Sequence, residues 1–141
     1  MLRKLIPVLL LLLFATSVTA AVQNSYLASS SQIIKLGTDE YRGIVATAQL
    51  QQLPGDAATD GNYLLTVSFS TKDDSSVLQN GDVAVKILSP DEHTSDPVRL
   101  NLIDDYYQSE IQLSGNGEFL ITVGSKLDDD KKRIFQFFYF R

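Results

Sequence analysis

Two acidic clusters in the chain contain the side chains best suited to binding a ligand. The first surrounds His93, the single histidine of the sequence, in the segment 90–97. An imidazole beside carboxylates can hold a hard or borderline cation. We favour a solvated loop bounded by two prolines, because adjacent carboxylates converge only where a loop wraps around an ion. We therefore expect no metal, and the weak candidates for a site are His93, Asp91, Glu92 and Asp96.

The second cluster is Asp104-Asp105-Tyr106-Tyr107, where paired carboxylates precede paired tyrosines at the end of a predicted strand. Such a group could bind a cation, a sugar or a basic peptide, because tyrosine offers a flat apolar face with a hydrogen-bonding tip. Two aspartates are also ordinary turn residues, and one of the tyrosines must point inward. The turn is the simpler interpretation, and all four residues are candidate contacts for a partner or ligand.

Neither cluster resembles an active site. A Ser-His-Asp triad would have to use His93, and the sequence contains no nucleophile elbow. The chain has no cysteine, and its single methionine is Met1. Disulfides, thiolate metal sites, haem attachment and cysteine nucleophiles are therefore excluded. We expect a protein without catalytic activity and without a cofactor.

Alternating apolar and polar residues predict strands along most of the chain after residue 31. The clearest pattern is at 107–113, and turn clusters such as Gly37-Thr38-Asp39 and Asp128-Asp129-Asp130 separate the strands. This pattern predicts an all-β, immunoglobulin-like antiparallel β-sandwich of seven or eight strands, with a small β-barrel as the alternative. The other predicted strands lie at 32–36, 42–50, 62–70, 82–88, 98–102, 119–123 and 134–140.

The last predicted strand, 134–140, carries aromatic residues on both faces. In one interpretation, one face fills the core while a loop or the leader covers the other. In the alternative, an exposed apolar strip docks a partner, with Phe135, Phe137 and Tyr139 as candidate contacts. Charged residues that protect against aggregation flank the strand on both sides. They are Lys131, Lys132, Arg133 and Arg141.

The first twenty residues have the pattern of a secretory signal peptide. Arg3 and Lys4 precede an apolar run at 5–14, and small residues favour cleavage after Ala20. The run is too short to span a bilayer, which needs about 20 apolar residues, so we expect no stable membrane insertion after cleavage. The predicted organisation is a signal peptide at 1–20, a flexible leader at 21–31 and one β-sandwich domain at 32–141.

The charge of the chain limits its partners. The formal charge is −5, and the loss of the two cations Arg3 and Lys4 makes it −7. Binding to nucleic acid needs clustered Lys and Arg, and a negative protein is also repelled by anionic lipid. We therefore expect no nucleic acid as a partner. The expected export and the aromatic last strand instead favour another envelope protein as the partner, in the periplasm or, alternatively, in the secreted medium. The oligomeric state is left open.

The order of strands and turns from about residue 60 onward resembles that of exported bacterial immunoglobulin-like domains of the FixH/YtkA-like kind. The resemblance implies a non-catalytic envelope domain associated with metal handling or with the assembly of respiratory and copper proteins. Such relatives place His and Met at positions that correspond to 62–65 and 102–107, where this chain has neither, so a copper role does not follow. The matching segments are 63–69, 81–87, 89–91, 97–100, 106–113, 117–124 and the closing aromatic strand.

These features predict a periplasmic accessory or interaction domain. The alternative is a small-ligand-binding module that takes a divalent cation or a carbohydrate on its acidic and tyrosine loops.

Overall fold

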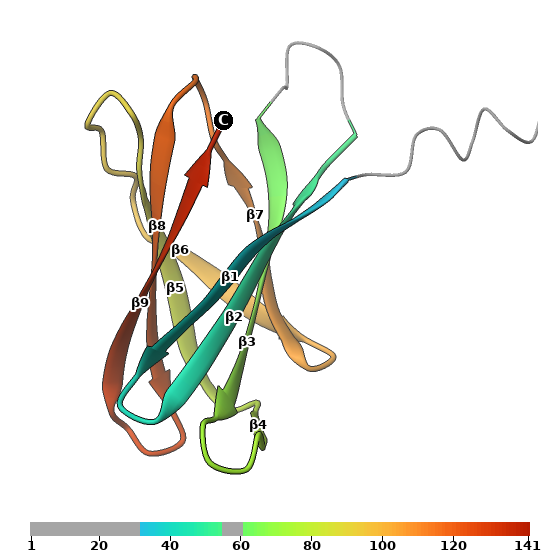
Figure 1. The fold of residues 1–141 in the computed structure, drawn as a ribbon, viewed down its shortest axis with the longest axis vertical. Helices are drawn as coiled ribbons and strands as arrows, with labels where there is room; N and C mark the ends of the chain where they lie inside the picture. The colour runs from blue at the N-terminus through green and yellow to red at the C-terminus, as the bar shows by residue number, and fades with distance from the viewer. Residues whose placement is uncertain (1–31, 55–60) are drawn as a thin grey trace, which may run out of the picture. The chain divides into compact units, whose positions relative to one another are not determined.

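The structure is a computed structural model that describes residues 32–54 and 61–141. The predicted signal peptide and leader lie outside the described residues. Within them, no helix is long and apolar enough to cross a membrane. The described chain forms nine strands joined by turns and loops (Figure 1). They are β1 Ile33–Tyr41, β2 Ile44–Gln52, β3 Asn62–Thr71, β4 Val77–Leu78, β5 Gly81–Leu88, β6 Val98–Ile103, β7 Tyr106–Gln112, β8 Glu118–Leu127 and β9 Lys132–Phe140.

The strands follow one antiparallel path in the order β1-β2-β3-β7-β6-β5-β8-β9, with β4 paired to β3. One sheet contains β1, β2, β3, β4 and β7, and the other contains β5, β8 and β9. β6 passes from one sheet to the other, because residues 98–100 pair with β5 and residues 101–103 pair with β7. At the ends of the path β1 lies beside β9, where the backbone N–H of Gln136 donates to Asp39 Oδ2 at 2.8 Å (Figure 1). The all-β antiparallel prediction is confirmed, in an arrangement between a sandwich and a barrel.

Side-chain alternation places the core between the two sheets. β5 buries Val83, Val85 and Ile87, as its alternation predicts. Aromatic rings fill the centre: the Phe69 ring lies 5.6 Å from Tyr107 and 5.5 Å from Phe135, centroid to centroid. These three residues come from β3, β7 and β9, so the rings join strands of both sheets.

The N-terminal hairpin differs from the prediction. Gly37-Thr38-Asp39, expected as a turn, lies inside β1, where a bulge between Lys35 and Gly37 shifts the register. The turn lies instead at Arg42-Gly43, and φ is positive at both residues, 50° and 79°. A two-residue hairpin loop needs this geometry because it matches the twist of the strands. The short strand β4 was not predicted, since two residues carry no alternation.

Arg133 is buried at the start of β9, although the sequence predicted an exposed flanking charge. It shares the inward face of the strand with Phe135 and Phe137, and its side chain is 3% exposed. Its Nη1 and Nη2 donate to the two carboxylate oxygens of Asp129 at 3.0 and 2.7 Å. Hydrogen bonds from Arg133, and one from the Lys131 N–H, hold the pKa of Asp129 well below its ordinary value.

We predict that Asp129→Asn lowers the melting temperature at neutral pH, because it leaves the buried guanidinium without its counter-charge. The native pKa of Asp129 is depressed, so its stabilisation is complete above the unfolded pKa of about 4 and is lost as the pH falls further. The difference in melting temperature between the wild type and the variant should therefore shrink below about pH 4. Asp128→Asn, in the same turn, is the control. An equal loss in both variants, or one independent of pH, would contradict the assignment.

Candidate functional site

The acidic residues of the second predicted cluster form the turn between β6 and β7. Ile103 pairs with Tyr106, so Asp104 and Asp105 make a two-residue loop. The φ of Asp104 is 55°, a left-handed conformation that aspartate tolerates better than most residues. The Asp105 Oδ1 accepts a hydrogen bond from Gln79 Nε2. Both aspartates therefore contribute to the shape of this turn.

The two tyrosines of this cluster point in opposite directions. Tyr106 is 47% exposed, whereas Tyr107 is buried against Phe69 and is not accessible to a large partner. Burial, together with the negative charges of Asp128 and Asp82, raises the pKa of Tyr107. Its hydroxyl makes no hydrogen bond with the described part of the chain. The cluster thus offers one tyrosine and two carboxylates to the outside.

The residues around His93 lie in an exposed loop between β5 and β6. The backbone N–H of His93 donates to Asp91 Oδ1 at 3.2 Å, and Glu92 and Asp96 are exposed. Within the described ranges, no three His, Asp or Glu side chains are grouped so that they could hold a metal ion.

The aromatic side chains predicted as contacts on the last strand are on its inner face. Phe135 and Phe137 are fully buried, so a partner of the folded domain would have to meet other residues. Tyr139 is half-buried, and its hydroxyl oxygen lies 3.4 Å from that of Tyr63. Burial and this contact raise the pKa of Tyr139 to about 12. Their burial places Phe135 and Phe137 in the core, which corrects the predicted contact face.

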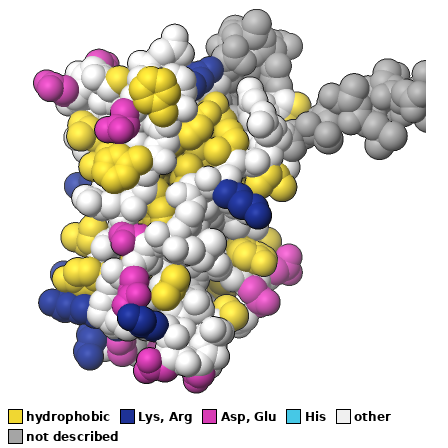
Figure 2. All heavy atoms as spheres, in the orientation of Figure 1, with side chains coloured by type: hydrophobic (Ala, Val, Ile, Leu, Met, Phe, Trp, Pro, Cys, Tyr) yellow, Lys and Arg dark blue, Asp and Glu magenta, His cyan; other side chains and the backbone are white. Residues whose placement is uncertain are grey.

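The exposed face of β9 carries three large apolar side chains. Ile134 and Phe138 are each 58% exposed, and Phe140 is 77% exposed. Phe138 continues a cross-strand row with Leu120 and Leu88 on the same face. Figure 2 shows hydrophobic side chains gathered on the surface where β8 and β9 run. We call Ile134, Phe138 and Phe140 the β9 strip.

Beside Ile134 the same outer face is hollowed into a depression of about 580 Å³, which we call the outer groove. Strand pairing explains its floor, because Arg99, Ala84, Gly124 and Ile134 form one row across β6, β5, β8 and β9. Ala84 and Gly124 are the middle members of this row, and their small size leaves the sheet uncovered between the larger side chains at the two ends.

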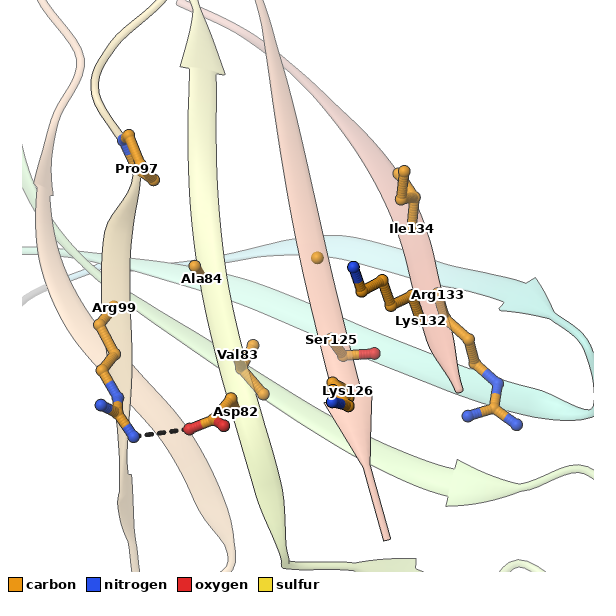
Figure 3. A pocket seen from close by; sticks show the side chains of 11 residues that line it. Asp82, Val83, Ala84, Pro97, Arg99, Ser125, Lys126, Lys132, Arg133 and Ile134 are labelled. Atoms are coloured by element: carbon orange, nitrogen blue, oxygen red, sulfur yellow. Dashed lines mark hydrogen bonds and ion pairs between the residues drawn. The ribbon is translucent and has the colours of Figure 1, made fainter. Parts of the chain in front are cut away.

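Charged side chains border the outer groove (Figure 3). On one side Arg99 Nη2 lies 2.6 Å from Asp82 Oδ1. Lys126 and Lys132 are neighbours of Asp82 in the next cross-strand row, and Lys126 Nζ lies 3.8 Å from Asp130 Oδ1. With Arg133, which is buried and paired with Asp129, four cations and one carboxylate belong to the lining itself.

Sequence reasoning did not find the outer groove. Alternation over 82–88 directs Ala84 outward, opposite to the buried Val83 and Val85, but a small outward residue on one strand does not by itself indicate a groove. The sequence did contain a sign of the groove, because two small residues, Ala84 and Gly124, lie at outward positions of two apolar strands. The groove appears only when these two residues become neighbours.

The comparisons with known proteins identify the fold. No family model and no curated protein sequence matches the chain. The structure is similar to the crystal structure of the PmoD soluble domain from Methylocystis sp. ATCC 49242 (Rockwell), with a TM-score of 0.50 and 10% sequence identity. The match covers 74% of this chain and 95% of that one. At this identity the likeness establishes a shared all-β fold.

We predict that Asp104→Gly leaves the free energy of unfolding unchanged or raises it, whereas Asp104→Ala lowers it by about 1 kcal/mol. The reason is that glycine accepts the left-handed φ of this turn and alanine does not. Urea denaturation measures both. Asp128→Gly is the control, since φ is not positive there. If Asp104→Gly proves as costly as Asp128→Gly, the carboxylate of Asp104 and not its backbone shapes the turn.

Proposed function

We propose that this protein is a non-catalytic accessory domain of the bacterial periplasm that binds another envelope protein through the β9 strip. The observation that carries the proposal is the exposure of Ile134, Phe138 and Phe140 on a strand whose opposite face already fills the core. Packing of the core accounts for Phe135 and Phe137, but it gives no reason for three large apolar side chains on the solvent-exposed face.

The physical case rests on the apolar area that a partner would remove from water. A side chain of this size contributes roughly 1.5–3 kcal/mol when it passes from full exposure to full burial. Ile134, Phe138 and Phe140 are 58–77% exposed, so each would contribute a corresponding fraction of that amount. Aromatic residues are also enriched in the centres of protein interfaces. Leu88 and Leu120 extend Phe138 into an apolar row across β5, β8 and β9, so this side chain is not an isolated exposed residue. Gln136 lies between this row and Ile134 on the outer face of β9.

The export signal expected at residues 1–20 supports the periplasmic part of the proposal. Membership of the FixH/YtkA-like kind is part of the same proposal, and the shared fold with the PmoD soluble domain is compatible with it. Metal handling is not part of the proposal, because the chain lacks the His and Met of such relatives at residues 62–65 and 102–107.

The absence of catalysis is likewise proposed on the chemistry of the exposed groups. His93 is the single histidine of the chain, and its loop is exposed on a strand connection. A catalytic base is normally oriented by a second group and protected from bulk water. His93 instead bonds through its backbone N–H to Asp91.

A second candidate function is the binding of a small hydroxylated ligand or a cation. A depression of about 360 Å³ is lined by Tyr107 and by the amide side chains of Gln79, Asn80 and Asn101. The buried hydroxyl of Tyr107 has no hydrogen-bond partner in the described chain. Amide and hydroxyl groups of this kind recognise sugar hydroxyls.

For the main proposal, a photo-crosslinking phenylalanine analogue in place of Phe138 should form one discrete protein adduct in the native envelope. The same analogue in place of Thr47, exposed on β2, should not. Phe138→Ser combined with Phe140→Ser should change the free energy of unfolding by less than about 0.5 kcal/mol, whereas Phe137→Ala should lower it by about 3–5 kcal/mol. Equal adducts from positions 138 and 47 would reject the β9 strip as the interface.

For the second candidate, Tyr107→Phe in the absence of ligand should keep or raise the melting temperature, because an unpartnered buried hydroxyl is removed. A panel of monosaccharides, Ca²⁺ and Zn²⁺ should then raise the melting temperature of the wild type and leave that of Tyr107→Phe unchanged. A panel without effect on the wild type would reject this candidate.

A further inference from the structure

We propose that the outer groove receives an acidic segment of the partner protein, with one apolar side chain over Ala84 and Gly124 and carboxylates against Arg99, Lys126 and Lys132. The inference rests on the proposed function and adds the chemistry of the partner. It uses a surface beside the β9 strip that shares Ile134 with it.

The floor of the groove is open because Gly124 has no side chain and its strand neighbours do not fill the space. A Cβ built on Gly124 would meet nothing nearer than the carbonyl oxygen of Ala84, at 4.0 Å. The backbone there does not have the positive φ that requires glycine. Gly124 is therefore required neither by backbone geometry nor by packing inside this domain, and what its small size provides is room on the outer surface.

The charges of the groove favour an anionic partner. The whole chain has 17 acidic and 12 basic residues, whereas the groove is lined by four cations and one carboxylate. One of these cations, Arg133, is buried and paired with Asp129. Arg99 is paired with Asp82, and Lys126 lies near the exposed Asp130. The three exposed cations, Arg99, Lys126 and Lys132, can orient carboxylates around the apolar floor and exclude a basic segment.

A peptide segment fits these features better than a lipid surface does. The net negative charge of the chain opposes adsorption to anionic lipid headgroups. The site is concave and about 580 Å³ in volume, in the range of pockets that take individual groups. The apolar surface of Ile134 at its border also requires a partner with an apolar group beside its carboxylates.

The test uses terminally blocked peptides as probes on the ¹⁵N-labelled protein, purified as the cell processes it. The acidic peptide Asp-Glu-Phe-Asp-Glu should shift the amide resonances of Ala84, Gly124 and Ile134. Two reference peptides should bind roughly tenfold more weakly. They are Asn-Gln-Phe-Asn-Gln, which lacks the charges, and Asp-Glu-Gly-Asp-Glu, which lacks the apolar group.

Two variants test the site itself. Gly124→Val fills the floor, and a β-branched residue suits a strand, so it should weaken the acidic peptide roughly tenfold with an unchanged melting temperature. The double variant Lys126→Gln with Lys132→Gln should also weaken binding of the acidic peptide, because it removes two positive charges from the groove. Lys35→Gln with Lys72→Gln removes two charges elsewhere and should have no effect beyond a small change in salt dependence.

Several results would overturn the inference. Equal binding of the acidic and neutral peptides would do so, as would binding that neither Gly124→Val nor the Lys126 and Lys132 pair weakens. Sedimentation with phosphatidylglycerol vesicles that these variants abolish would assign the groove to a membrane instead. In each of these cases a discrete adduct from position 138 would leave the proposed function standing, so the two failures are distinguishable.

Discussion

The packing of Phe69 is the interaction that the rest of the domain depends on. Its ring contacts Tyr107 within one sheet and Phe135 in the other, at 5.6 and 5.5 Å. The chain has no cysteine, so no disulfide can align the two sheets, and aromatic packing must do so. Once Phe135 is held in the core, alternation directs Ile134 and Phe138 outward. The apolar strip on the surface is thus a consequence of how the core is built.

The inward placement of Phe135 also explains why a charged side chain is buried at the start of β9. Arg133 is on the inward side of β9 because it is two residues before Phe135, and it is tolerated there through its paired hydrogen bonds to Asp129. Lys132, one residue earlier, is directed outward and borders the outer groove. Adjacent basic residues at the start of β9 therefore have different roles, one in the fold and one at the surface.

The likeness to the PmoD soluble domain shows how loosely this fold is tied to particular residues. The two chains share 10% of their residues while the match covers 95% of the PmoD domain. Many different sequences have the alternation and the turn positions that this fold requires. Two chains can therefore share the fold while most of their side chains differ. A site on this chain therefore depends on its own residues and not on the shared fold, as the cationic border and the small floor residues of the outer groove illustrate.

The sequence by itself determined the all-β class, the inward residues of most strands and the two-sided aromatic character of 134–140, because alternation and turn chemistry are local properties. It did not determine that Arg133 is buried, that β1 extends through Gly37, or that Phe138 and not Phe137 faces outward. The tertiary structure alone brought Arg99, Ala84, Gly124 and Ile134 into one row. Strand order and register depend on contacts between residues far apart in the chain, and a one-residue shift in register would reverse every face.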